Sequence, residues 1–166
     1  MRVPEAGSAL RCGCGGRLTD TVLHPPSNRP VSTSVVEVRS YELDSFGHAN
    51  HAVFLNWLEY GRFGALEKAG FPYDDIVARG WGIYVVRLEV DYLREARLGE
   101  RLLVRTWADG YRRSSMALAQ QIVLDEHPTV EIARARVTAV WVGSDRRPLR
   151  VPEEIRHALG GEVPSA

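Results

Sequence analysis

The residues best suited to chemistry lie in a short stretch where a polar loop runs into an apolar, helix-like segment. Asp44, His48, Asn50 and His51 fall close together there. Imidazole titrates near neutral pH and can carry protons, while the free amides at a helix start carry the positive end of the helix dipole and can polarise a carbonyl. A turn-forming Asp44 and histidines bonded only within their own loop would explain the same residues. The stretch therefore offers either a carbonyl-activating site or a well-capped helix start.

Charge is balanced over the whole chain and concentrated locally in arginine clusters. Lys plus Arg and Asp plus Glu each total 21, so the formal net charge is zero. No overall field would hold nucleic acid or an anionic membrane, and neither is an expected partner. An anionic ligand must be met locally, and the candidate clusters are Arg112-Arg113-Ser114 at a predicted hairpin and Arg146-Arg147 with Arg150 near the end. Each cluster also suits a solvated turn.

A long helix must position the loop, and its predicted span is residues 51–69. Asn50 is a suitable N-cap, apolar residues follow at helical spacing, and Gly70 ends the segment. Gly61 and Gly64 each cost about 1 kcal/mol in a helix relative to Ala. Their presence predicts that another backbone approaches the helix closely.

Strand-like segments surround this helix in the sequence. Alternation, β-branched residues and turn signals predict strands at residues 33–40, 83–93, 102–108, 115–124 and 130–142, and a short helix within 148–159. The segment 83–93 is predicted to bury one face, made of Tyr84, Val86, Leu88, Val90 and Tyr92. Asp109-Gly110 predicts a hairpin turn. One long helix followed by four sequential antiparallel strands is an α+β layout in which the sheet covers the helix.

The 166 residues suit a single domain, and 45% apolar with 25% charged residues is ordinary for a globular chain. Residues 1–31 are rich in Gly and Pro and contain no aromatic residue, so they are predicted to be a flexible extension, followed by a domain over 32–160. Cys12 and Cys14 have only His24 nearby, too few ligands for a zinc site. No apolar run approaches the ~20 residues that span a bilayer and no secretory signal is present, so a cytoplasmic location is expected.

An Asp-x-x-Gly-His-x-Asn loop runs into an aromatic-rich helix that carries a Glu and an Arg three residues apart. This pattern, from Tyr41 to Arg62, resembles the opening signature of the 4-hydroxybenzoyl-CoA thioesterase-like acyl-CoA thioesterases. The likeness covers roughly residues 33–158 and continues through 85–92, 97–100 and 146–152. It implies the hotdog fold, in which a five-stranded, mainly antiparallel sheet wraps a long central helix.

The resemblance implies thioester hydrolysis without a metal or cofactor. The reaction needs a nucleophile or a base, and donors where negative charge develops. Asp44 matches the loop carboxylate of the family, which attacks the thioester to form a mixed anhydride or deprotonates water. The amide of His51, beside the capping Asn50, would be the main oxyanion donor. Some relatives carry the working carboxylate on the helix, where this sequence has Glu59. Glu59 could instead pair with Arg62, three residues further on, so Asp44 is the preferred catalytic carboxylate.

The implied substrate is an acyl-CoA or an acyl carrier protein thioester. Coenzyme A carries phosphates that require cations. The expected substrate-binding residues are Gly47, His48, Arg87, Arg112, Arg113, Ser114 and Arg147. The fold also implies a homodimer or homotetramer whose active site includes partner residues. Two alternatives are a hotdog hydratase or dehydratase, whose loop would carry a Pro that residues 44–51 lack, and a non-catalytic acyl-thioester binding module.

Overall fold

The computed structural model describes residue 23 and residues 25–161. Most of the predicted extension, with Cys12 and Cys14, lies outside this part of the chain. The elements follow in the order β1 (Ser32–Glu37), the 3-10 turn η1 (Ser40–Glu42), α1 (His51–Lys68), α2 (Tyr73–Ala78), β2 (Gly82–Tyr92), β3 (Arg101–Tyr111), β4 (Ser115–Leu124), β5 (Glu131–Val142) and α3 (Glu153–Ala158).

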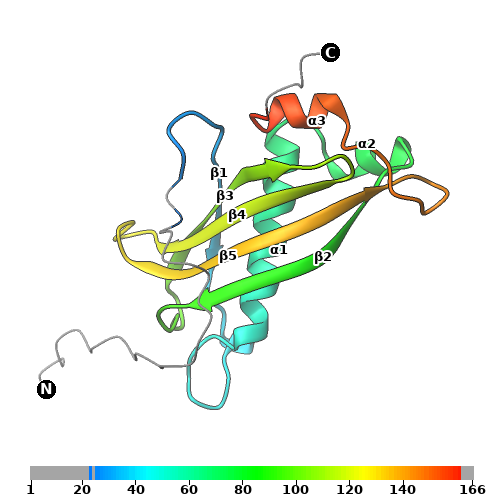
Figure 1. Ribbon diagram of the computed structural model, residues 1–166. Coiled ribbons are helices and arrows are strands. Elements are labelled where there is room, and N and C mark those ends of the chain that lie inside the picture. The colour runs from blue at the N-terminus through cyan, green and yellow to red at the C-terminus, as the bar shows by residue number, and fades with distance from the viewer. Residues whose placement is uncertain (1–22, 24, 162–166) are drawn as a thin grey trace, which may run out of the picture.

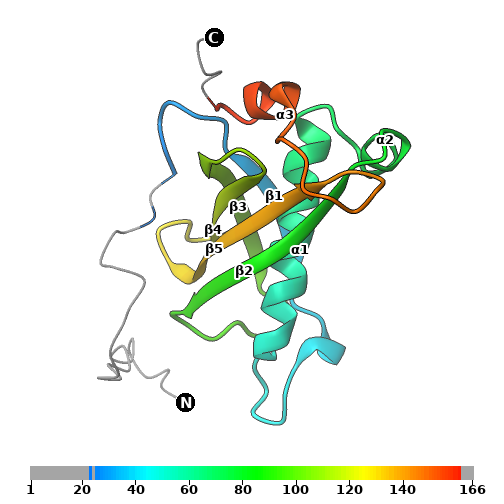
Figure 2. The same ribbon diagram turned by 45° about the vertical axis from the view of Figure 1, so that its right-hand side comes forward.

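The five strands form one antiparallel sheet in the order β1-β3-β4-β5-β2. The strands β1 and β2 are therefore its two edges. The helix α1 runs along one face of the sheet, with the loop that precedes it at one end and α2 and α3 at the other (Figures 1 and 2). This arrangement confirms the predicted α+β layout of one long helix covered by a five-stranded sheet.

The helix α1 begins and ends where the sequence predicts. Asn50 caps it, because its side-chain Oδ1 accepts a hydrogen bond of 2.9 Å from the amide of Ala52. At the other end Gly70 adopts a left-handed φ of 87°, and the amide of Phe71 returns to the carbonyl of Leu66 at 2.9 Å. Its buried residues form the face against the sheet: Phe54, Trp57, Leu58, Gly61, Ala65 and Leu66.

The two helical glycines allow the close approach that the sequence predicts. A Cβ on Gly61 would lie 2.5 Å from Cγ1 of Val104, and a Cβ on Gly64 would lie 2.5 Å from Oγ of Ser34. The helix and sheet are also joined by a buried amide beside Gly61. The side chain of Gln120 donates to the carbonyl of Leu58 at 2.8 Å. Glycine at position 61 therefore lets a hydrogen bond form across the layers.

The strand β2 differs from its predicted one-sided burial. Leu88 and Val90 pack against the core, but Tyr84 and Val86 are 54% and 60% exposed. The pairing of β2 with β5 shifts between Val85 and Arg87, and this irregularity changes which side chains share a face. Because β2 is also an edge strand, its first half leaves the apolar side chains of Tyr84, Val85 and Val86 about half exposed.

The predicted hairpin covers Asp109-Gly110 and the arginines that follow, and the structure places its turn at the arginines and not at Asp109-Gly110. The strand β3 continues to Tyr111, and its register with β4 shifts between Ala108 and Gly110 instead of ending there. The chain turns at residues 112–114, where the amide of Arg112 donates to the carbonyl of Ser115 at 2.8 Å. The arginines therefore lie at the tip of the hairpin.

The helix α2 was not predicted.

The described part of the N-terminal segment lies against the domain. Leu23 packs with Trp107 and Ala119, and the side chain of Arg29 donates to the carbonyl of Ala108 at 3.1 Å. No helix in the described ranges is both long enough and apolar enough to cross a membrane.

Candidate functional site

The loop ahead of α1 is a tight turn closed by backbone hydrogen bonds. Leu43 and Ala49 form an isolated antiparallel bridge across its base. The amide of Asp44 donates to the carbonyl of His48 at 2.8 Å, and the amide of Gly47 donates to the carbonyl of Asp44 at 3.1 Å. Gly47 has a φ of 79°, which favours glycine and explains its place in the predicted pattern. The loop thus holds Asp44 at a fixed position beside the helix start.

The two oxygens of the Asp44 carboxylate have different surroundings. Oδ1 accepts hydrogen bonds from the amides of Phe46 at 2.9 Å and His48 at 3.4 Å. Oδ2 accepts no hydrogen bond from any described residue, and the side chain is only half-buried. One oxygen therefore orients the carboxylate in its turn, while the other is available to a substrate or water.

The helix start offers one backbone donor. The amides of Ala52 and Val53 donate to the side chain and the carbonyl of Asn50, both at 2.9 Å. The amide of His51 donates to no acceptor in the part of the chain that the structure describes. Tyr92 fixes this turn of helix by donating from its hydroxyl to the carbonyl of His51 at 3.0 Å. A free amide and the positive end of α1 thus coincide at His51.

His48 faces the turn that follows β2. Its Nε2 lies 3.2 Å from Oε2 of Glu95, and its backbone forms an isolated bridge with Arg97. A hydrogen bond from Arg97, aided by the nearby charges of Arg97, His48 and Arg94, holds the pKa of the Glu95 carboxyl below its ordinary value. His48 therefore faces a carboxylate that is ionised at neutral pH.

Glu59, the second candidate carboxylate, is exposed on α1. Its expected partner Arg62 donates instead to the side chain of Gln120 at 3.1 Å, on the sheet. Burial lowers the pKa of the Arg62 guanidinium, while the charge of Glu59 acts in the opposite direction. Glu59 and Asp44 thus differ in that only Asp44 is held by backbone amides.

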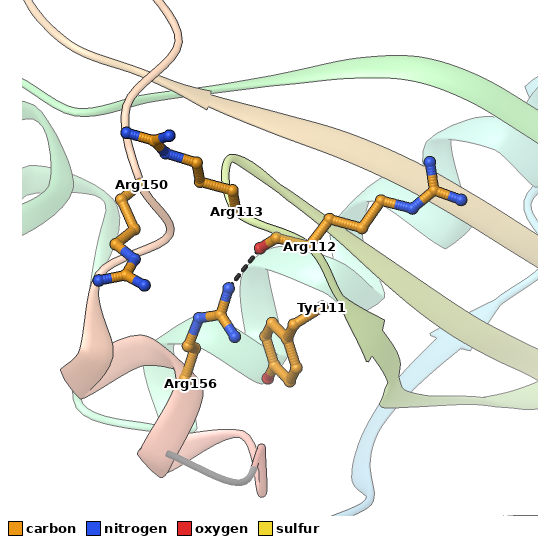
Figure 3. Close-up of a pocket in the computed structure, with 5 residues that line it drawn as sticks. All are labelled: Tyr111, Arg112, Arg113, Arg150 and Arg156. Carbon is orange, nitrogen blue, oxygen red and sulfur yellow. Dashed lines mark hydrogen bonds between the residues drawn. The ribbon is translucent and has the colours of Figure 1, made fainter. Parts of the chain in front are cut away.

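Four arginines line a hollow of about 470 Å³ beside α3, together with Tyr111 (Figure 3). They are Arg112, Arg113, Arg150 and Arg156. Arg156 donates to the carbonyl of Arg112, and its guanidinium lies 5.1 Å from the centre of the Tyr111 ring. None of the four guanidinium groups forms an ion pair with a carboxylate of residues 25–161. The hollow, which we call the arginine pocket, is therefore suited to an anion.

Three other residues were predicted to bind the substrate, and they lie at different places relative to the arginine pocket. Arg87 lines an adjoining cleft of about 650 Å³ that shares Tyr111 and Arg112 with the pocket. Arg147 has an 86% exposed side chain next to Asp145 and lines neither hollow. Ser114 holds the hairpin through its carbonyl, which accepts from the amide of Trp141 at 2.8 Å.

Tyr111 and Arg156 are residues that sequence reasoning missed. Arg156 enters the arginine pocket from α3, and its hydrogen bond to Arg112 joins residues 44 positions apart. No local pattern indicates such a contact. Burial raises the pKa of the Tyr111 hydroxyl to about 12. Within the described ranges, no three metal-ligating side chains gather at one place.

Comparison with known proteins assigns the chain to a family. The model of the thioesterase-like superfamily matches residues 38–159. The chloroplastic acyl-acyl carrier protein thioesterase ATL2 of Arabidopsis thaliana is 32% identical over 127 residues, which are 75% of this chain and 66% of that protein, just under two thirds. The long-chain acyl-CoA thioesterase FadM of Escherichia coli is 29% identical over 125 residues, 75% of this chain and 93% of that one.

A solved structure gives the same assignment at the level of the fold. The 1,4-dihydroxy-2-naphthoyl-CoA thioesterase Slr0204 of Synechocystis superposes with a TM-score of 0.72 at 20% identity, covering 78% of this chain and 96% of that one. At this identity the likeness concerns the fold alone, and it confirms the predicted hotdog fold. The chain belongs to the thioesterase-like superfamily.

Proposed function

We propose that the protein is an acyl-CoA thioesterase that hydrolyses an acyl or aroyl thioester to a free acid and CoA. One observation carries the proposal: Oδ2 of Asp44 and the amide of His51 lie at the same loop and helix start. Neither group has a hydrogen-bond partner among the described residues. Membership in the thioesterase-like superfamily supports this reading.

In the proposed reaction, the amide of His51 donates to the thioester oxygen as negative charge develops on it. Oδ2 of Asp44 either attacks the carbonyl carbon or removes a proton from an attacking water. In the first route the C–S bond breaks to give a mixed anhydride and CoA thiolate, and water then hydrolyses the anhydride. In the second route the deprotonated water adds to the carbonyl carbon, and the C–S bond of the resulting tetrahedral intermediate breaks to give the free acid and CoA thiolate. The side chain of His51 would carry a proton to the leaving thiolate.

The arginine pocket would take phosphates of CoA. Guanidinium groups bind phosphate through paired, charge-assisted hydrogen bonds, and Arg112 and Arg113 were expected to do so. The pocket adds Arg150 and Arg156, and Arg87 lies in the adjoining cleft. Arg112, Arg113, Arg150 and Arg156 have no carboxylate partner among the described residues, which supports this role, whereas Arg87 pairs with Glu89 at 2.5 Å.

A single substrate would be bound by two copies of the chain. The arginine pocket is lined by Arg156 of α3, and α3 lies at the C-terminal end of α1, while the loop that carries Asp44 precedes the N-terminus of α1 (Figure 1). The 18 residues of α1 separate them by about 27 Å at 1.5 Å per residue, a span longer than the phosphopantetheine arm. A homodimer formed through the exposed edge of β2, at Tyr84, Val85 and Val86, would bring the pocket of one copy toward the loop of the other.

Release of free CoA thiol from a panel of acyl-CoAs tests the proposal. Short aliphatic, long aliphatic and aromatic thioesters would be compared, together with acyl carrier protein thioesters. We expect thiol release with at least one acyl-CoA class. Formation of a hydrated acyl-CoA without thiol release, or binding without any turnover, would contradict the proposal and favour the hydratase or the binding module.

A further inference from the structure

The loop that carries Asp44 is held by β2 and by the segment that follows β2. The amide of Ala49 donates to the carbonyl of Ala96 at 2.8 Å, and both residues are buried. Tyr92, at the end of β2, binds the first residue of α1. The loop and this segment are therefore joined at two points that do not depend on charge.

A third connection is made by side chains, and its carboxylate is held in place. One oxygen of Glu95 accepts from Nε of Arg97 at 3.0 Å and from the same guanidinium through Nη2. Its other oxygen lies 3.2 Å from Nε2 of His48. The amide of Arg97 donates in turn to Oε2 of Glu100 at 2.9 Å, and Glu100 pairs with Arg94. Glu95 thus belongs to a network of charges and is not an isolated pair.

The backbone of His48 is hydrogen-bonded to Asp44. Its carbonyl accepts from the amide of Asp44 at 2.8 Å, and its amide donates to Oδ1 of Asp44 at 3.4 Å. A rotation of the His48 backbone would therefore turn the Asp44 carboxylate as well.

We propose that Glu95 is a positioning residue of the active site, which acts through His48 to hold the Asp44 carboxylate. The inference rests on the proposed function, because it assigns Glu95 to the same reaction. His48 and Glu95 side chains are 36% and 38% exposed, and such pairs contribute little to global stability. Catalysis is more sensitive than stability, since a displacement of about 1 Å at the reacting group can cost roughly 10²-fold in rate.

The kinetic test uses Glu95→Gln, His48→Gln and the double variant. Glu95→Gln keeps the size of the side chain and removes its charge, so we expect kcat to fall by about tenfold, within that limit, with little change in KM. Because Glu95 acts through His48, the double variant should lose no more than the more affected single variant. Asp125→Asn is the matched control, since it removes the carboxylate of another surface pair, with Arg101 at 3.2 Å. Its kcat should match the unmodified protein.

Hydrogen exchange supplies a readout that does not require activity. In Glu95→Gln we expect faster exchange of the amides of residues 46–49, and no change in α1 or in the Asp125→Asn control. Wild-type kcat and exchange in Glu95→Gln, or additive losses in the double variant, would overturn the inference. Faster loop exchange in a protein that hydrolyses no thioester would instead support the connection to the loop and refute the proposed function.

Discussion

Asp44 shows how one side chain can hold a turn and still offer an oxygen for the proposed reaction. Its Oδ1 accepts two loop amides, which is what a turn-forming aspartate does, and its Oδ2 stays available. The two interpretations of Asp44 that the sequence left open are therefore compatible. The position of Asp44, Asn50 and His51 could be predicted because it depends on residues within one turn. Arg156 could not, because its neighbours in the arginine pocket come from other segments.

Tyr111 gives a test at the same scale. Its hydroxyl is buried and has no hydrogen-bond partner among the described residues. Tyr111→Phe keeps the ring under Arg156 and removes this unpaired group, so we expect the free energy of unfolding to rise by about 1 kcal/mol. Chemical denaturation at neutral pH measures it. A clear loss of stability would mean that the hydroxyl is satisfied.

The same tyrosine predicts a loss of stability in alkali. Its pKa in the folded protein is about 12, above the ordinary value of 10. Ionisation of Tyr111 therefore does not affect the free energy of unfolding below pH 10. As the pH rises from about 10 to 12 the unfolded chain loses the proton first, so the free energy of unfolding falls. Denaturation at a series of pH values should show a steeper decline for the unmodified protein than for Tyr111→Phe. Equal slopes would contradict the raised pKa.

The elements differ in how far their own sequence determines them. The helix α1 has its cap, its apolar spacing and its terminating glycine within its own residues, and its predicted bounds were right to one residue. The exposed face of β2 and the continuation of β3 through Asp109-Gly110 were not predicted, because both depend on bulges. A bulge is set by pairing with another strand, and neither β2 nor β3 carries it as a pattern.

Glycine to alanine changes in α1 separate helix propensity from packing. Gly61→Ala would gain about 1 kcal/mol of propensity, but its Cβ would meet Val104 at 2.5 Å and the buried Gln120 at 3.2 Å. We expect a net loss of about 1–3 kcal/mol in the free energy of unfolding. Gly64→Ala meets only the rotatable hydroxyl of Ser34 and should be nearly neutral. Urea denaturation of both variants measures this, and equal effects would contradict the packing argument.

At the scale of the whole molecule, the proposed function pairs the loop of one copy with the arginine pocket of a second copy. Val86→Asp places a charge on the exposed edge of β2, where we expect two copies to meet. Light scattering should show dissociation to monomers over micromolar concentrations, and turnover should fall with it. A monomeric variant, or an unmodified monomer, with full activity would refute the two-copy site.

The arginine pocket predicts selectivity for the carrier of the acyl group. Arg113→Gln and Arg150→Gln each remove one cation from it. A charged hydrogen bond contributes about 1.5–3 kcal/mol, so KM for acyl-CoA should rise about tenfold or more. KM for the matching acyl-pantetheine, which lacks the nucleotide, should not change. A parallel rise with both substrates would place the phosphates elsewhere.

The composition of the chain predicted a single neutral domain, and the resemblance of its motifs to a known family implied the hotdog fold. The sequence contained no sign of which distant arginines would meet, because their contact depends on the folded sheet and on α3. The proposed dimer likewise depends on which strands remain at the edges, and only the sheet order identifies β1 and β2 as edges.

The central claim, that the loop carboxylate carries the reaction, is tested most directly by turnover of Asp44→Asn beside Glu59→Gln. The asparagine keeps the size and most of the turn but can neither attack the thioester nor accept a proton from water. We predict that kcat falls by about 10²-fold or more while KM changes little, and that Glu59→Gln keeps most of its turnover. Near-normal turnover in Asp44→Asn, with loss of turnover in a folded Glu59→Gln, would contradict the account and assign the reaction to the helix carboxylate.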